Sequence, residues 1–458
     1  MDLIIKGGTV VTAAESFIAD VAVKDGKIAA IGAGLRAAGA KTVNAKGLYV
    51  LPGAIDVHTH LQMPFGGTVS ADGYGAGTRA AVCGGVTTVF DYAIQRKGKG
   101  IVQTVRERLA LAAPQLAADL AFHCAITDLG ENAALLDEFD AAADFGVTSF
   151  KCFMVYRKEG MMIDDGMLLR ILEKARDTGI LTNVHAENPD VIDARTAVFL
   201  AEGKTSPWYH YLSRPEFVEA EAVHRAIRWA KQVGAPLYIV HLACAEGVEA
   251  VAAAKAAGQR IYAETCPQYL EFTAEAYKRA DGRNFVCSPP IKGEESRAAL
   301  WTALKNGVID TVATDHCPFM QSEKDWGIDN YTKIPNGCPG IETLYPYLLA
   351  AANAGKLTFS RAVRVCADTP AKLFGLPQKG SLAPGKDADI VLYDPKKRFT
   401  VGVGAMHSDC DQTIWEGIKL KGYPVKTYLR GKPVYADGAY IGTPGDGQYV
   451  ARQRFLGL

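Results

Sequence analysis

The sequence LPGAIDVHTH, residues 51–60, indicates a buried strand that ends in two histidines. Apolar side chains lead into the pair, and Pro52 and Gly53 mark the start of the run. Residues two apart in a strand point to the same face, so His58 and His60 aim their imidazoles at one point. Two neutral imidazoles can bind a divalent metal but do not complete a site, and such a pair also occurs in sheets by chance. If the pair binds metal, the rest of the chain must supply anions and further ligands.

The middle of the chain alternates strand-like and helix-like segments. Strands are predicted at 54–60, 87–93, 120–126, 148–156, 180–187, 236–242, 260–265 and 309–315. Helical patterns fall between several of them, at 101–117, 165–178, 217–233, 247–257 and 296–306. This alternation favours an α/β fold of the TIM type, a (β/α)8 barrel, over an open doubly wound sheet.

Both ends of the chain are instead rich in short strands and tight turns. In residues 20–31, strand-like runs lie on both sides of the turn dipeptide Asp25-Gly26. Residues 425–438 likewise consist of short strand-like runs separated by turn residues. We therefore expect one small β domain built from both termini, although sequence alone does not show that they pair. The expected division is a β domain from residues 1–52 and 377–445, a barrel from 53–376, and a C-terminal tail from 446–458.

The composition excludes several classes of partner. The 458 residues carry 50 Lys and Arg against 50 Asp and Glu, without a block of like charges, so neither nucleic acid nor an acidic membrane is expected to bind. Ten cysteines without a C-x-x-C pair are typical of reduced, buried thiols. The chain opens without a signal-like segment, and no apolar run reaches about eighteen residues. We expect a soluble cytoplasmic protein.

Side chains that can bind metal recur at the carboxyl ends of the predicted strands, where a barrel has its chemistry. The candidates are His58, His60, Lys151, His185, His241 and Asp315. Four imidazoles and one carboxylate hold two divalent cations only if an anion bridges them. A lysine in an apolar strand tends to lose its proton, and the neutral amine can take up carbon dioxide as a carbamate with two bridging oxygens. The alternative is that Lys151 pairs with a buried carboxylate.

In this pattern the chain resembles the cyclic amidohydrolases, and most closely their dihydropyrimidinase/D-hydantoinase group. The matching motifs run in family order across nearly the whole chain. They are PGAIDVHTH at 52–60, QMPF at 62–65, SFK at 149–151, VHAEN at 184–188, SPP at 288–290, TDHCPF at 314–319 and IPNG at 334–337. Lys292 departs from the family, which often has an arginine at that place after the SPP motif.

The resemblance implies a barrel with a β-sandwich formed by both termini, two divalent metals that are usually zinc, and a homotetramer. His58, His60 and Asp315 would hold one metal, and His185 and His241 the other. Carboxylated Lys151 and a hydroxide would bridge the two metals. The substrate would be a small cyclic ureide, a 5,6-dihydropyrimidine or a 5-substituted hydantoin, that is opened to an N-carbamoyl amino acid.

The resemblance also implies roles around the ring. Asp315 would act as general base and then as general acid, and Tyr156 would hydrogen-bond the developing oxyanion. Main-chain groups at Ser288 and Asn336 would fix the imide and ureide edge of the ring. The pocket for the ring substituent would be lined by Met63, Phe65 and Phe153, although each of these could equally be core.

Two alternatives stay open. Allantoinase and dihydroorotase usually carry an arginine two residues after the second histidine, where this chain has Gln62, which speaks against a carboxylated substrate. A metal-free scaffold of the same fold is the other alternative, although all six ligand positions are filled. The remaining histidines are expected to be structural or solvated, and His316 should face away from Asp315 in an extended strand. They are His123, His210, His224, His316 and His407.

Overall fold

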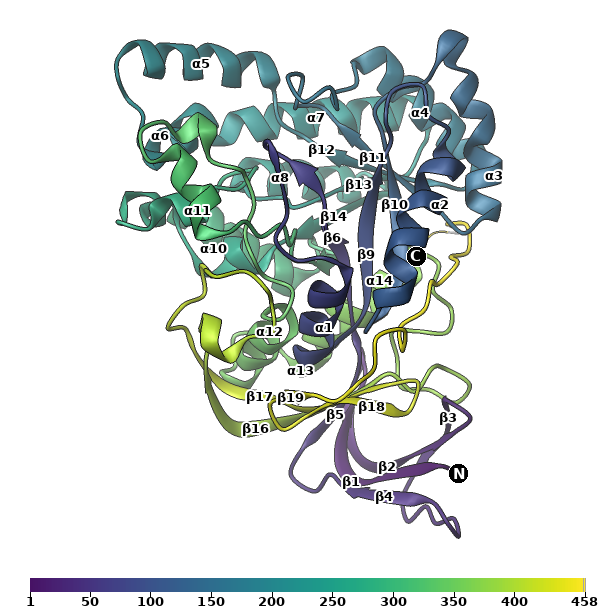
Figure 1. The fold of residues 1–458 in the computed structure, drawn as a ribbon. Coiled ribbons are helices and arrows are strands. Elements are labelled where there is room, and N and C mark those ends of the chain that lie inside the picture. Colours follow the sequence, from purple (N-terminus) through teal and green to yellow (C-terminus); the bar gives the residue numbers. More distant parts are fainter. Residues whose placement is uncertain (456, 458) are drawn as a thin grey trace.

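A computed structural model describes residues 1–455 and 457, and its centre is a parallel barrel (Figure 1). The eight strands neighbour one another in chain order and are β6 (Ala54–Thr59), β9 (Val86–Ile94), β10 (Asp119–Ile126), β11 (Ser149–Phe153), β12 (Leu181–His185), β13 (Leu237–Ile239), β14 (Ile261–Thr265) and β15 (Thr311–Val312). A backbone hydrogen bond from His60 N to His316 O, 2.8 Å long, joins the last strand to the first. The predicted (β/α)8 fold is confirmed.

Helices surround the barrel and connect its strands (Figure 1). They are α1 (Tyr74–Cys83), α2 (Ile101–Ala112), α3 (Glu138–Asp144), α4 (Asp165–Thr178), α5 (Pro189–Ala201), α6 (Pro207–Ser213), α7 (Glu216–Val233), α8 (Ala245–Ala256), α9 (Pro267–Glu271), α10 (Glu294–Asn306), α11 (Gln321–Lys324), α12 (Leu344–Asn353), α13 (Phe359–Val363) and α14 (Thr369–Leu373). Helix α4 has the predicted bounds because local signals set both ends. The Asp164 side chain accepts a hydrogen bond from Met167 N, and Gly179 ends the helix in the left-handed conformation.

The two termini build one nine-stranded sheet, which confirms the predicted small β domain. Its strands are β1 (Leu3–Val11), β2 (Ser16–Lys24), β3 (Lys27–Gly32), β4 (Lys41–Asn44), β5 (Tyr49–Pro52), β16 (Ile390–Thr400), β17 (Lys419–Leu429), β18 (Lys432–Ala436) and β19 (Ala439–Tyr440). The halves meet where β5 pairs antiparallel with β16, with Leu51 opposite Val391. Apolar side chains from both halves share one buried cluster beneath this sheet. A further short hairpin, β7 (Pro64–Phe65) and β8 (Thr68–Val69), follows the first barrel strand.

Buried charges join the β domain to the barrel. Lys379 Nζ lies 2.7 Å from a carboxylate oxygen of Asp119, at the start of β10, and 2.7 Å from one of Asp389, which precedes β16. Arg430, after β17, also pairs with Asp119. Lys379 and Arg430 therefore compensate the buried carboxylates of Asp119 and Asp389. These ion pairs hold the β domain against the barrel.

The C-terminal tail lies along the barrel, across the amino ends of its strands. Leu120 N, in β10, donates a hydrogen bond to Gln448 O (2.8 Å), and Phe455 N donates one to Gly179 O (2.8 Å), just before β12. The buried guanidinium of Arg452 donates to the carbonyl oxygen of Phe122 inside the barrel. The tail does not cover the carboxyl ends of the strands, where the candidate ligands lie; loops surround that end of the barrel.

All ten cysteines are buried and free, as predicted. Within the described part of the chain, no helix combines the length and the apolar character that crossing a bilayer requires.

Candidate metal centre

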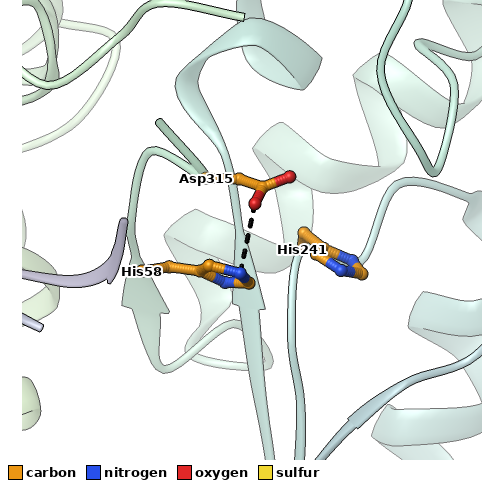
Figure 2. Close-up of side chains that lie close together, drawn as sticks. All are labelled: His58, His241 and Asp315. Carbon is orange, nitrogen blue, oxygen red and sulfur yellow. Dashed lines mark ion pairs between the residues drawn. The ribbon is translucent and has the colours of Figure 1, made fainter. Parts of the chain in front are cut away.

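Strands β6 and β15 bring three of the predicted ligands to one point. His58 Nε2 lies 3.1 Å, and His60 Nε2 3.0 Å, from the same carboxylate oxygen of Asp315. Figure 2 shows His58 and Asp315 joined as an ion pair, with the side chain of His241 beside them. Burial opposes the charge of Asp315, but His58 and His60 outweigh it and hold the pKa of this carboxyl well below its usual range. Asp315 is therefore an anion beside two imidazoles.

His185, at the end of β12, and His241, two residues after β13, face each other beside this group. Their ring centroids are 4.4 Å apart, and the centroid of His241 lies 5.3 Å from that of His58. One ligand atom each of His58, His241 and Asp315 lies within 4.8 Å of the others. Burial holds the pKa of His241 well below its usual range, so its imidazole stays neutral, which is the form that binds metal.

Several nitrogens at this point have no hydrogen-bond partner in the described structure. They are buried side-chain atoms, namely Nδ1 of His60, Nδ1 of His241 and Nε2 of His58, which faces only the Asp315 carboxylate at 3.1 Å. Buried polar atoms are normally satisfied, so orphans that gather at one point need an explanation. A cation-binding site provides one, because neutral imidazole nitrogens are common ligands of divalent metals. The donor set fits two divalent cations.

Lys151, in β11, lies among the histidines without an anionic partner. Its side chain is 1% exposed, and no carboxylate of the described residues lies within ion-pair distance of its Nζ. Nζ instead lies 4.9 Å from the ring centroid of Tyr92 and 5.2 Å from that of Phe153. Burial lowers the pKa of Lys151 from 10.5 to about 8. The alternative in which this lysine pairs with a carboxylate finds no support in the structure.

Two buried glutamates behind the histidines escaped the sequence reasoning. Glu264, in β14, accepts a hydrogen bond from His58 Nδ1 (2.6 Å) and one from His241 N (3.0 Å). Glu187, two residues after β12, accepts one from His185 Nε2 (2.8 Å). Because both lie at the carboxyl ends of predicted strands, the rule that found the ligands could have found them too. Such carboxylates fix the ring orientation of a metal-binding histidine.

A small cavity of about 40 Å³ opens beside these ligands. Every residue predicted to bind substrate lines it, namely Met63, Phe65, Phe153, Tyr156, Ser288 and Asn336. Asn336 Nδ2 donates a hydrogen bond to Ser288 Oγ (2.9 Å), and Phe65 packs edge-on against Tyr156 with centroids 5.5 Å apart. Burial raises the pKa of the Tyr156 hydroxyl, which therefore stays protonated. A wider outer cavity of about 250 Å³ shares Phe65, Tyr156 and Asn336 with it.

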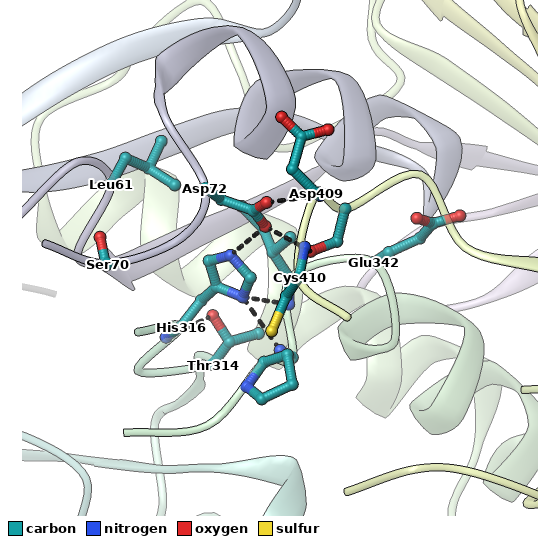
Figure 3. Close-up of polar contacts among 12 residues, drawn as sticks. Leu61, Ser70, Asp72, Thr314, His316, Glu342, Asp409 and Cys410 are labelled. Carbon is teal, nitrogen blue, oxygen red and sulfur yellow. Dashed lines mark hydrogen bonds and ion pairs between the residues drawn. The ribbon is translucent and has the colours of Figure 1, made fainter. Parts of the chain in front are cut away.

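His316 is held away from the ligand group, as predicted. Its Nε2 lies 2.9 Å from a carboxylate oxygen of Asp72, and its Nδ1 accepts a hydrogen bond from Gly340 N (3.0 Å) (Figure 3). Asp72 also accepts hydrogen bonds from Ser408 Oγ and Asp409 N, so this carboxylate links His316 to the segment after β16. His123 is a satisfied core histidine, bonded to Ser149 and to the backbone of β6.

The other polar residues that the sequence singled out are structural or exposed. His210 is buried and bonded to a backbone carbonyl, His407 pairs with Glu342, and His224 is exposed.

The chain is similar to known proteins over its whole length. Residues 49–434 match the amidohydrolase family. A D-hydantoinase of Ralstonia pickettii is 44% identical over 460 residues, which cover 99% of this chain and 100% of that protein. The solved structure of a dihydropyrimidinase from Brevibacillus agri is 41% identical, covers 99% of each chain and has a TM-score of 0.97. That of an L-hydantoinase (dihydropyrimidinase) from Arthrobacter aurescens is 32% identical, covers 98% of this chain and all of that one, and has a TM-score of 0.91.

Proposed function

The chain belongs to the amidohydrolase family as a cyclic amidohydrolase of the hydantoinase/dihydropyrimidinase type, and we propose that it works with two divalent metals. Its substrates would be 5,6-dihydropyrimidines and 5-substituted hydantoins, and its products N-carbamoyl amino acids. The observation that carries the proposal is the convergence of six ligand residues from five strands, with orphaned imidazole nitrogens and an unpaired lysine among them.

The side chains divide between two half-sites. The first half-site consists of His58, His60 and Asp315, and the second consists of His185 and His241. Lys151, as a carbamate, would lie between them. When bound, two divalent cations lower the pKa of a bound water and polarise the carbonyl of the ring.

Two residues of the chain act on protons in the reaction, one by transferring a proton and one by donating a hydrogen bond. Asp315, an anion in this environment, accepts the proton of the attacking water and returns it to the ring nitrogen that departs. Tyr156 keeps its proton and donates a hydrogen bond to the carbonyl oxygen as negative charge develops there. Both side chains line the inner cavity.

The wall of the cavity orients the ring. Main-chain groups at Ser288 and Asn336 would bind the imide and ureide edge, and a hydrogen bond between the two side chains holds these residues together. Met63, Phe65 and Phe153 offer an apolar surface to the substituent. This division of polar and apolar wall suits a ring with one ureide edge and one substituted carbon.

The lining of the inner cavity also bears on the allantoinase and dihydroorotase alternatives. It includes no arginine, and Gln62 is not part of it. A substrate carboxylate would therefore find no guanidinium to pair with among the residues that line this cavity. This supports uncharged cyclic ureides over carboxylated ones.

Metal content together with a ring-opening assay tests the proposal. Protein prepared with zinc should contain two metals per chain and should open dihydrouracil and at least one enantiomer of a 5-substituted hydantoin. Less than one metal per chain would favour the scaffold alternative. Failure to open any of these rings in metal-loaded protein would overturn the substrate class. Zinc as the metal, the homotetramer and the cytoplasmic location stay predictions, and light scattering would measure the oligomer.

A further inference from the structure

The two half-sites differ in the charge that lies behind their histidines. Glu264, behind the first half-site, is fully buried and accepts hydrogen bonds from His58 Nδ1, His241 N and the Tyr238 hydroxyl (2.8 Å). Among the described residues, no lysine or arginine lies within ion-pair distance of it. Of the side chains that the structure describes, the one basic group in contact with it is His58 of the first half-site, so the negative charge of Glu264 acts on that half-site.

Glu187, behind the second half-site, has a cationic partner. Its Oε2 accepts the hydrogen bond from His185 Nε2 and lies 2.7 Å from Arg214 Nη1. Both side chains are buried, so the guanidinium faces this carboxylate with little water between them. Glu187 and Arg214 together contribute no net charge.

We infer that the two half-sites bind divalent cations unequally, the first more tightly than the second. The first half-site holds the carboxylate of Asp315 and the uncompensated carboxylate of Glu264, whereas the second holds two neutral imidazoles and a neutral ion pair. A carbamate on Lys151 would be shared and does not alter this difference. In a buried site with little water, an uncompensated anion attracts a cation strongly. The inference rests on the two-metal centre proposed above.

Glu264 also ties the two half-sites together. It orients the His58 ring from one carboxylate oxygen and holds the backbone of His241, whose φ of +37° is left-handed, through the same atom. It is thus a positioning residue for both half-sites and a charge-compensating residue for the first. Substitution by glutamine separates these roles, because the amide oxygen can accept the same two hydrogen bonds while the amide nitrogen faces the Tyr238 hydroxyl oxygen.

Zinc competition with a chelator of known affinity measures the difference directly. Titration of the wild-type protein, with metal counted by mass spectrometry, should show two steps whose dissociation constants differ at least tenfold. Anomalous diffraction at half loading should place the metal beside His58, His60 and Asp315. In Glu264→Gln the dissociation constant of the tighter half-site should rise by roughly 10- to 100-fold, the range found when a carboxylate behind a metal-binding histidine is removed.

Glu342→Gln is the matched control. Glu342 is also a buried carboxylate that accepts hydrogen bonds from a histidine Nδ1 and a backbone N–H, those of His407, but it lies outside the site. Both zinc constants should keep their wild-type values in this variant. A change equal to that in Glu264→Gln would show a general effect of losing a buried carboxylate and would overturn the inference.

Arg214→Met tests the same idea from the second half-site. Loss of the guanidinium leaves Glu187 uncompensated, so the dissociation constant of the weaker half-site should fall. A folding defect cannot produce tighter metal binding. Equal constants in the wild type, or an unchanged tighter constant in Glu264→Gln that binds two metals, would refute the inference. A wild-type protein that binds no metal would instead refute the two-metal proposal itself.

Discussion

Lys151→Met should stabilise the metal-free protein and abolish its metal centre. Burial lowers the pKa of Lys151 from 10.5 to about 8, because it outweighs the attraction of Asp315 and Glu264, and no carboxylate of the described residues forms an ion pair with its Nζ. At about 1.4 kcal/mol for each pKa unit, the lowered pKa costs the folded chain about 3 kcal/mol at pH 7. Methionine fills a similar volume without a charge, so the metal-free variant should exceed the metal-free wild type by up to about 3 kcal/mol in free energy of unfolding.

The sign of the pH dependence is fixed by the same pKa. In the folded chain Lys151 loses its proton near pH 8, whereas in the unfolded chain it keeps the proton up to about pH 10.5. The cost is therefore complete below pH 8 and disappears as the pH rises toward 10.5. The advantage of Lys151→Met should shrink in parallel over that range.

Chemical denaturation of chelator-treated protein, kept free of bicarbonate, measures this advantage at pH 7 and at pH 10. Zinc with bicarbonate should then raise the unfolding midpoint of the wild type but not of the variant, which should contain little metal and open no ring. A variant that keeps two metals and full activity would refute the bridging role. If metal-free Lys151→Met were less stable than the metal-free wild type by the same amount at both pH values, the conclusion that Lys151 is buried without a partner would be refuted.

Three further substitutions test single contacts. Tyr156→Phe should lower kcat by roughly 100- to 1,000-fold with metal content unchanged, as measured by steady-state kinetics, and a loss below threefold would argue against oxyanion stabilisation. Asp315→Asn should bind fewer than two metals and show no ring opening above background; ring opening at the wild-type rate would exclude Asp315 as the base. Lys379→Met should lower the free energy of unfolding by about 3–5 kcal/mol, because Asp119 and Asp389 lose their buried cation. A loss under about 1 kcal/mol in denaturation experiments would show that Arg430 alone compensates both carboxylates.

Short-range patterns in the sequence were sufficient to predict the barrel and to select side chains that the fold brings together, whose binding of metal stays a prediction. Helix α4 has the bounds that its helical pattern predicted, and in the structure Asp164 and Gly179 mark its ends. His58 and His60 share a face because side chains alternate along a strand. The last strand shows where this reasoning stops. It was predicted to end at Asp315, but regular pairing ends at Val312 and Asp315 has a φ of +52°.

What the sequence left open depends on contacts between residues far apart in the chain. Nothing near Leu51 indicates that it pairs with Val391, and a glutamate at the end of β14 becomes meaningful only because His58 lies 2.6 Å away. Helix α5 was missed for a different reason. Its apolar residues are spread around the helix, and only Pro189 and Ile192 are buried, so no 3.6-residue period marks it.

Backbone strain at the carboxyl ends of the strands explains why buried carboxylates recur there. Tyr156, His241 and Asp315 all have left-handed φ values, of +69°, +37° and +52°, and such conformations each cost on the order of 1–3 kcal/mol. In each case the turn comes shortly after a barrel strand and redirects the side chain over the barrel. A turn of this kind persists only where surrounding bonds hold it.

Two carboxylates supply such bonds. Glu264 accepts from His241 N, and Asp56 accepts from the backbone and hydroxyl of Thr314, the residue before Asp315. Burial raises the pKa of Asp56 to about 6, so keeping this carboxylate ionised at neutral pH is itself unfavourable for folding. Both anions therefore act on the protein chain before any metal binds, since they hold the strand ends in the conformation that makes the imidazoles converge. The orientation of the candidate ligands is therefore set by the folded chain itself.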